Sequence, residues 1–404
     1  MIDRLLYFSA VDLAASDGPG TNEFEFTLSL SKRFGRNAWC VVKKPTCRVP
    51  HLDHMNTVYM PLPELNSGLK FLFARLRFAR EISRLVRENR IDLVVGRLGN
   101  EPFVPWFLQR LFRMKVALKT VGRWWFDGPP RSNRDRVVRK VFESLSVSTL
   151  KNALAVDAGM EELVEKIARL KGVGSRVICI PNAVNTDHFQ PAEILPVIPG
   201  CDLTGFWPVL GFVGTSPSLR GARQMVQVAS SIRVDYPNVA VLVVGWDDGM
   251  EDVVDSARRL GIVERCHFPG VVPYGRVPLY VNRMTIGFSF FESWVTRRVG
   301  NASQKVRQYL ACGMPVISIR EGHAFLDNEE LGSTVDPDNV AEIEIATRKW
   351  LKRLSEDATA IKSRLRQYAV EHLSTEQAMT ERLRFWNECK NEIPRHNGRG
   401  EQVR

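Results

Sequence analysis

The sequence lacks the long apolar run that a membrane-spanning helix needs. Such a helix takes about 20 consecutive apolar residues, and no segment of the 404-residue chain comes near that length, although 44% of its residues are hydrophobic. The first residues, Met1–Ala10, also lack the basic segment, long apolar core and small-residue cleavage site of a secretory signal. We therefore expect a globular, cytoplasmic protein that is long enough for two domains with separate cores.

Paired cysteines, clustered metal ligands and a dinucleotide motif are lacking as well. The seven cysteines are odd in number and scattered, which indicates reduced thiols rather than a disulfide framework. The histidines and aspartates are dispersed, so the sequence predicts no metal site. Internal repeats and the pattern G-x-G-x-x-G are missing too, and no dinucleotide cofactor is predicted.

Acidic residues are fewer than basic ones: the chain has 45 acidic and 56 basic residues, and its formal net charge is +11. This excess suggests an acidic partner, which could be a nucleotide, a phospholipid surface or a nucleic acid. No nucleic-acid recognition motif accompanies the charge, so no nucleic-acid partner is predicted.

Part of the excess lies in the predicted helix Leu69–Arg90, which has only Glu81 and Glu88 as acidic residues. Its basic residues are Lys70, Arg75, Arg77, Arg80, Arg84, Arg87 and Arg90. Its predicted core stripe is Leu69, Leu72, Phe73, Leu76, Ala79, Ile82 and Val86, with Phe71 and Phe78 outside it. Basic residues among aromatic ones are typical of contact with an anionic membrane, and the basic stretch 131–140 favours the same interpretation. The alternative is a solvated helix whose arginine stems cover apolar surface.

Short apolar segments alternate with helical patterns along the chain, which predicts an α/β fold with parallel sheets. In such folds, ligands bind beyond the carboxyl ends of the strands. Two segments follow predicted strands in this way: the glycine-containing loop Ser16–Glu23, ahead of the predicted helix Phe24–Phe34, and the tryptophan-rich stretch around Arg123. A plain turn and a packing corner are the respective alternatives.

Residues Asn301–Ile319 predict a helix, a sharp stop and a buried strand. Lys305 and Gln308 are three residues apart and share one helix face, while Gly313 and Pro315 end the helix. Free amides at a helix amino terminus, together with a nearby lysine, favour an anion such as phosphate. A buried helix–strand unit without a ligand is the alternative.

Five segments, in this order, resemble the retaining glycosyltransferases of family 4, the group 1 type. They are the glycine loop at Gly18–Gly20, the stretch R-V-I-C-I-P-N-A-V-N-T-D-H-F-Q-P at Arg176–Pro191, the turn Gly214–Gly221, the loop His267–Pro273, and Asn301–Ile319. Any one of them could arise by chance, so the resemblance rests on their ordered agreement. It implies a GT-B fold, in which two Rossmann-like domains face each other across a central cleft.

The resemblance also implies how the chain is divided. Residues 1–190 would form an acceptor-side domain, 191–207 a linker rich in proline, and 208–373 a nucleotide-sugar-binding domain. A helix at 374–393 would cross back to the first domain, and 394–404 would be a disordered tail.

The function implied is transfer of a sugar, with retention of configuration, from a nucleotide-diphosphate sugar to a glycan or lipid-linked acceptor. The implied setting is synthesis of surface polysaccharide or glycoconjugate in the cytoplasm, with the protein peripheral on the inner face of the cell membrane. The nucleotide sugar is a substrate, and neither a cofactor nor a metal is implied.

The site residues are carried over position by position. The expected catalytic residues are Arg220 and Lys305, which would neutralise the donor diphosphate, and Arg123 on the acceptor side. The expected donor-binding residues are Gly20, Gly214, Thr215, Gly221, Gly270, Ser303 and Gln308.

Three positions depart from the family pattern. Gln308 stands where a glutamate holds the donor ribose, Gly300 where many members have another glutamate, and Thr215 where an arginine supplies a second charge. Gln308 can still exchange hydrogen bonds with ribose hydroxyls. These losses leave an alternative function open, that of a non-catalytic nucleotide-sugar-binding protein or partner subunit with the same fold.

Overall fold

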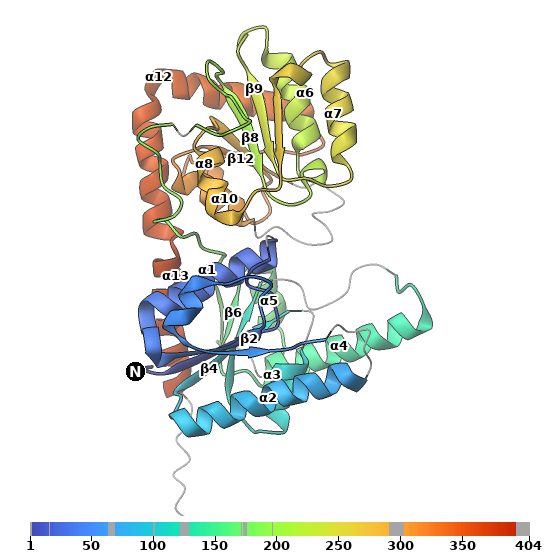
Figure 1. The fold of residues 1–404 in the computed structure, drawn as a ribbon, viewed down its shortest axis with the longest axis vertical. Helices are drawn as coiled ribbons and strands as arrows, with labels where there is room; N and C mark the ends of the chain where they lie inside the picture. Colours follow the sequence, from blue (N-terminus) through green and yellow to red (C-terminus); the bar gives the residue numbers. More distant parts are fainter. Residues whose placement is uncertain are drawn as a thin grey trace, which may run out of the picture.

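Two parallel sheets, each flanked by helices, make up the computed structural model of the chain (Figure 1). The structure describes residues 2–15, 17–63, 69–99, 102–121, 129–170, 172, 176–195, 197–290 and 303–392. The α/β fold predicted from the sequence is confirmed, and both sheets have the all-parallel form that βαβ crossovers produce.

The first sheet has seven strands in the order β3-β2-β1-β4-β5-β6-β7. Its strands are β1 (Leu5–Ser9), β2 (Ala38–Lys43), β3 (Asn56–Met60), β4 (Leu93–Leu98), β5 (Val116–Thr120), β6 (Val156–Ala158) and β7 (Val177–Cys179). Every residue of β1, β5 and β6 is buried, because helices cover both faces of a parallel sheet.

The helices of this half are α1 (Gly18–Phe34), α2 (Leu69–Asn89), α3 (Phe103–Arg110), α4 (Asn133–Lys151) and α5 (Glu161–Ala168). Helix α1 begins six residues before the helix expected at Phe24–Phe34, so the predicted loop boundary is wrong. The Asp17 carboxylate accepts a 2.6 Å hydrogen bond from the Gly20 amide, and Pro19 lies in the first turn. A capping carboxylate and an early proline both favour a helix start.

The buried face of α2 agrees with the predicted stripe at Ala79 and Ile82 but departs from it in the first half of the helix. Leu69 and Phe73 are 73% and 68% exposed, whereas Phe71 and Phe78 are buried. The reason is Arg75, whose guanidinium lies 3.9 Å from the centre of the Phe71 ring and donates a 2.7 Å hydrogen bond to the carbonyl of Pro63. With its polar atoms occupied in this way, an arginine can face the interior.

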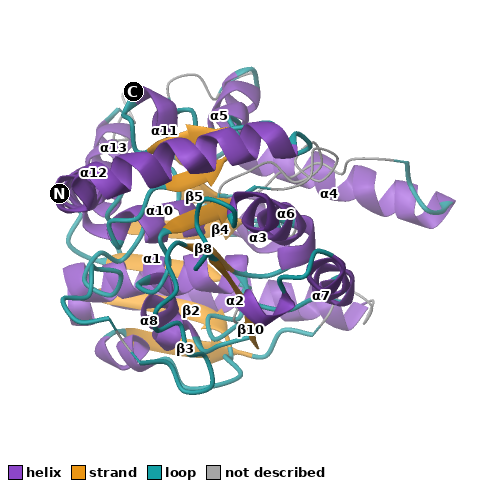
Figure 2. Cartoon of the chain, turned by 90° about the horizontal axis from the view of Figure 1, so that it is seen from above, coloured by secondary structure: helices purple, strands orange, loops and turns teal. Residues whose placement is uncertain are grey.

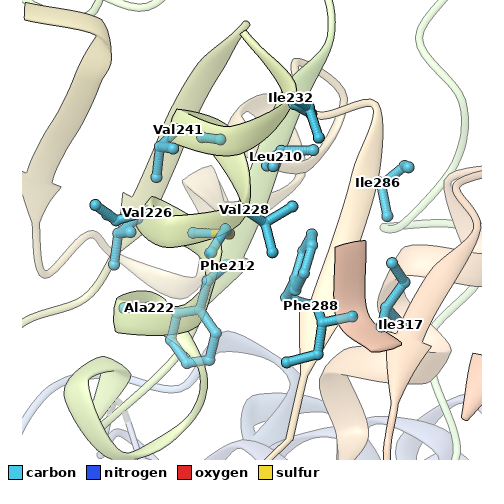
Figure 3. Close-up of a cluster of buried hydrophobic side chains, with 14 of the residues drawn as sticks. Leu210, Phe212, Ala222, Val226, Val228, Ile232, Val241, Ile286, Phe288 and Ile317 are labelled. Atoms are coloured by element: carbon cyan, nitrogen blue, oxygen red, sulfur yellow. The ribbon is translucent and has the colours of Figure 1, made fainter. Parts of the chain in front are cut away.

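The second sheet has six strands in the order β10-β9-β8-β11-β12-β13. Its strands are β8 (Val209–Val213), β9 (Ala240–Val244), β10 (Cys266–Gly270), β11 (Ile286–Ser289), β12 (Val316–Ser318) and β13 (Gly332–Thr334). Its helices are α6 (Ala222–Ile232), α7 (Met250–Arg259), α8 (Val277–Val281), α10 (Gln304–Ala311) and α11 (Phe325–Asn328). Figure 3 shows part of the core between α6 and the sheet, where Phe212, Val226 and Phe288 pack together.

Two last helices connect the halves. Helix α12 (Val340–His372) runs along the second sheet, with one non-helical residue at Asp357, and α13 (Thr375–Asn391) lies against the first sheet (Figures 1 and 2). Trp386 of α13 is fully buried in the same cluster as Leu5 and Leu30.

Short 3₁₀ turns complete the described elements. They are η1 (Gly35–Asn37), η2 (Pro50–His54), η4 (Pro217–Leu219), η5 (Val263–Arg265) and η6 (Tyr274–Arg276). Within the described ranges, none of the helices is long and apolar enough to cross a membrane.

Candidate functional site

Lys305 lies at the centre of the donor-side residues, in the first turn of α10. Its side chain is buried, with the ammonium nitrogen 4.5 Å from the centre of the Phe212 ring of β8. Gly214 follows β8 with φ at +136°, and a Cβ there would stand 3.0 Å from Cε and 3.2 Å from Nζ of the lysine. The glycine therefore gives Lys305 room to lie along the loop.

Arg220 brings a second positive charge to the same place. Burial lowers the pKa of Lys305 well below its ordinary value, and the nearby Arg220 lowers it further. Burial also lowers the pKa of Arg220 to about 10, an effect that Asp247 opposes. In the part of the chain that the structure describes, no carboxylate pairs with Lys305. A buried cation without a counter-ion is costly, so this site favours an anionic ligand.

The glycines predicted to line the donor site have distinct roles. Gly221 caps α6 with φ at +105°, and a Cβ there would come within 2.6 Å of the Phe290 ring. Gly270 ends β10 with φ at +75° and accepts a 2.8 Å hydrogen bond from the Gly245 amide. Thr215 is exposed and places a neutral side chain beside Gly214.

Ser303 and Gln308 lie on α10 with Lys305. Ser303 caps the helix, with its hydroxyl oxygen 2.8 Å from that of Ser289 at the end of β11. Gln308 is buried. Burial and the neighbouring Glu25 raise the pKa of Tyr274 well above its ordinary value, and Gln308 acts to lower it. The structure thus brings Lys305, Ser303 and Gln308 together on one short helix.

One predicted residue, Gly20, lies on the first half of the chain and not on α10. Gly20 lies in the first turn of α1, where a Cβ would come within 2.4 Å of the Ala15 carbonyl oxygen. Its amide is already used by Asp17, so in this structure Gly20 shapes the helix start. Arg123 and Gly300 lie outside the described residues.

Sequence reasoning missed a contact between the two halves. Tyr274, which begins η6, donates a hydrogen bond to the Glu25 carboxylate on α1. Burial raises the pKa of Glu25 to about 7, although Tyr274, Lys32 and the Asn185 amide all act to lower it. No motif marks either residue, and only the folded arrangement of the halves brings them together.

A buried charge cluster in the first half was missed too. Glu23 is fully buried and accepts hydrogen bonds from Arg97 at 2.6 Å and Lys119 at 2.7 Å, and from the Tyr7 hydroxyl. Burial alone would raise the pKa of Glu23, but Lys119 and Arg97 hold it below its ordinary value. Burial lowers the pKa of Lys119 to about 8. Arg97 and Lys119 stand on the carboxyl-terminal parts of β4 and β5.

The described residues contain no group of three or more histidine, cysteine, aspartate or glutamate side chains placed to hold a metal ion. All seven cysteines are free thiols.

Comparison with known proteins identifies relatives of both the second half and the whole fold. The family described as "Glycosyl transferases group 1" matches residues 207–353. A 2-deoxystreptamine glucosyltransferase from Streptomyces kanamyceticus is 26% identical over 162 residues, which cover 39% of this chain and 42% of that protein. The match thus spans less than half of the curated relative.

Solved structures match along nearly the whole chain. A glycosyltransferase from Rickettsia africae ESF-5 has a TM-score of 0.70 at 15% identity, covering 96% of this chain and 99% of its own. HepE from Anabaena, in complex with UDP, has a TM-score of 0.68 at 15% identity, covering 94% of this chain and 99% of its own. At this identity the likeness concerns the fold, and it confirms the predicted arrangement of two Rossmann-like domains. Residues 207–353 thus match the group 1 glycosyl transferases, and the chain has the GT-B fold along its length.

Proposed function

We propose that the protein transfers a sugar from a nucleotide-diphosphate sugar to a glycan or lipid-linked acceptor, with retention of the anomeric configuration. The donor would bind to the second domain, with its diphosphate at Lys305 and Arg220 and its ribose at Gln308. The acceptor would bind to the first domain. The proposal includes no metal ion and no cofactor, and it places the reaction in the synthesis of surface polysaccharide or glycoconjugate.

The observation that carries this proposal is the pair of cations formed by the buried Lys305 and the half-buried Arg220. The leaving group of such a transfer is a nucleoside diphosphate, on which negative charge develops as the sugar departs. Donors fixed in a buried place stabilise that charge without having to reorganise. Burial and a second cation lower the pKa of Lys305. A bound diphosphate would place negative charge beside the lysine and so stabilise its ammonium form.

A panel of UDP-, ADP- and GDP-linked sugars tests the proposal through release of nucleoside diphosphate and transfer to added glycan acceptors. We expect turnover with at least one donor by the wild-type protein and loss of that turnover in Lys305→Met. Lys349→Met is the matched control, because Lys349 is exposed on α12. Equal turnover in both variants would show that Lys305 does not contact the diphosphate.

A second candidate function is nucleotide-sugar binding without catalysis. Thr215 leaves the site with one fewer charge than the family pattern, and Gln308 replaces the ribose-binding carboxylate. Calorimetric binding of a nucleotide sugar, with neither hydrolysis nor transfer in the presence of acceptors, would favour this candidate.

The acceptor side suggests attachment to an anionic membrane. Helix α2 exposes Lys70, Phe73, Arg77 and Arg80 at spacings of three or four residues, which places them along one face. Figures 1 and 2 show α4 projecting from the body of the first domain, and its exposed residues include Arg134, Val137, Lys140 and Val141. Exposed apolar residues among basic ones suit the interface of an acidic bilayer, where a lipid-linked acceptor would lie.

A further inference from the structure

Ser303 caps α10 by its position in the chain, but its side chain takes no part in the cap. A serine at the N-cap position ordinarily accepts a hydrogen bond from an amide of the first turn. Ser132 at the start of α4 and Ser374 at the start of α13 do so, at 3.1 and 3.2 Å. Ser303 has an extended backbone too, with φ at −65° and ψ at 114°, yet its side chain makes no capping hydrogen bond. Its hydroxyl oxygen lies instead 2.8 Å from that of Ser289.

Ser289, at the end of β11, is fixed in place. It is buried and is paired with Ser318 of β12 in the sheet. The Ser318 hydroxyl donates a 2.5 Å hydrogen bond to the Ser289 carbonyl and lies 2.9 Å from Nδ1 of the fully buried His323. Burial lowers the pKa of His323 to about 3, so its ring is neutral at neutral pH. Ser289 is therefore a rigid partner for the Ser303 hydroxyl.

The backbone of Ser303 is held as well. Nη1 of the buried Arg307 donates a 2.9 Å hydrogen bond to the Ser303 carbonyl. With the backbone fixed and already extended, a rotation about the Cα–Cβ bond is what separates the present hydroxyl position from a capping one. The hydrogen bond with Ser289 selects between these two positions.

The position of this hydroxyl decides what the first turn of α10 can bind. A capping hydroxyl would occupy one of the turn's amides, whereas a hydroxyl held at Ser289 leaves that amide available to an anion. Lys305 in the same turn independently indicates an anion, because it is buried and no carboxylate pairs with it among the residues that the structure describes.

We infer that Ser289 is a positioning residue, which holds the Ser303 hydroxyl off the first-turn amides of α10 and so keeps an amide free for the donor diphosphate. The inference rests on the proposed function, which places the diphosphate at Lys305. A phosphate oxygen then takes the place that the Ser303 hydroxyl would have as a cap. Ser289 itself does not touch the donor.

The test is calorimetric binding, first of UDP, ADP and GDP to the wild-type protein to find the nucleotide to use. Ser289→Ala releases the Ser303 hydroxyl, which should then cap α10 and compete with the phosphate. We expect the affinity to fall by about fivefold, the usual value of a capping hydrogen bond. Adding Ser303→Ala removes the competing hydroxyl and should raise the affinity again by about the same factor.

Two controls separate this effect from a general loss of structure. Ser231→Ala removes a 2.6 Å serine hydrogen bond to Glu344 elsewhere in the second domain, and should change the affinity by less than about twofold. The matching nucleoside lacks the diphosphate, so its affinity, measured by competition with the nucleotide, should be the same in the wild-type protein and Ser289→Ala. Thermal melting of each variant checks that it is folded.

The outcomes separate the inference from the proposed function. An unchanged affinity in Ser289→Ala would overturn the inference, as would an equal loss for the nucleoside. No gain, or a further loss, on adding Ser303→Ala would also overturn it, because the Ser303 hydroxyl would then not compete with the phosphate. These results would leave diphosphate binding by the wild-type protein intact. No binding of any nucleoside diphosphate by the wild-type protein would overturn the proposed function and the inference with it.

Discussion

Lys305 and Arg220 place two positive charges in an interior where a single one is already costly. Burial is the main cause of the low pKa of each, because the charged form loses its hydration. Residues with strongly shifted pKa values cluster at functional sites. An anion bound between the two cations would stabilise their charged forms. Two predictions concern these residues.

Replacing Arg220 with alanine should lower kcat/KM for the donor at least tenfold. The change removes a guanidinium that can grip phosphate with two hydrogen bonds. Arg223→Ala is the matched control, since that side chain lies nearby on α6, is 46% exposed and has only a 3.6 Å ion pair with Asp252. A loss within about threefold, under ~1 kcal/mol, would show that Arg220 is not the phosphate contact.

Binding of a nucleoside diphosphate should take up a proton in the pH range between the lowered pKa of Lys305 in the free protein and its raised pKa in the complex. Burial and the nearby Arg220 hold the pKa of Lys305 well below 10.5, and a bound anion favours the ammonium form, so the pKa of Lys305 rises on binding. Affinity should therefore fall as the pH rises above the depressed value. Calorimetry in two buffers of different ionisation enthalpy measures the uptake. Lys305→Arg keeps its charge at pH 8 and should bind without that uptake; unchanged uptake in this variant would assign the proton to another group.

Contacts between residues close in the sequence could be predicted, whereas contacts between distant residues were missed. Lys305, Ser303 and Gln308 could be predicted to lie close together because they belong to one short motif, which the structure forms as α10 and the residue before it. Tyr274 and Glu25 are 249 residues apart and meet only when the two domains are placed against each other. Pairing of this kind leaves no periodic pattern in a single sequence.

Helix α13 stabilises the first domain although it lies at the other end of the sequence. It follows the second domain in the sequence but packs against α1 and the first sheet, with Trp386 and Met379 in their shared core. Arg382 forms a buried 2.9 Å ion pair with Asp157 of β6. Because breaking a buried pair leaves an uncompensated charge, α13 is bound by a polar contact as well as by apolar packing.

Trp386→Ala should destabilise the first domain by about 3–5 kcal/mol, the usual cost of emptying a buried aromatic site. The free energy of unfolding from urea denaturation measures this loss. Arg384→Ala on the exposed side of the same helix should change it by less than about 0.5 kcal/mol. Similar values for the two variants would mean that α13 adds little to the stability of the first domain.

The order and type of the elements were more predictable than the faces they bury. Alternating strands and helices predicted two parallel sheets, and the structure has them. The core stripe predicted for α2 was wrong in its first half, because apolar periodicity treats every arginine as exposed, whereas Arg75 is buried against Phe71. The start of α1 was misplaced because a Gly-Pro-Gly sequence is typical of a loop, while the Asp17 cap sets the helix there.

For the whole molecule, the net charge of +11 and the exposed faces of α2 and α4 lead to the membrane proposal. The protein should co-sediment with vesicles of acidic phospholipid and be released by salt, because each basic residue near such a surface contributes roughly 1 kcal/mol. Salt shortens the screening length of these charges from about 10 Å at ~0.1 M to about 3 Å at ~1 M. Vesicles of neutral lipid should bind far less.

Charge reversal locates the surface. Arg77→Glu with Arg80→Glu should reduce sedimentation, since both side chains are exposed on α2, whereas the buried Arg75 and the ion-paired Arg84 are poor choices. Lys349→Glu with Lys352→Glu, exposed on α12 of the second domain, carries the same change in net charge. If the two pairs lose binding equally, net charge alone attracts the protein and no docking face exists on α2. Binding to neither type of vesicle would remove the membrane proposal.

The return of α13 to the first sheet makes the second half an insertion within the first. The chain leaves and re-enters at neighbouring points, since Val184 and Ser374 form a backbone bridge. The Val184 amide donates to the Leu373 carbonyl at 2.9 Å, and the Thr375 amide donates to the Val184 carbonyl at 3.0 Å. A protein truncated after the first sheet would therefore lack α13 and Trp386, and the core of the first domain would be exposed. A stand-alone first domain would instead need the 184–190 segment joined by a short linker to residue 375. The second half, whose two ends meet at this bridge, could be excised as one continuous piece.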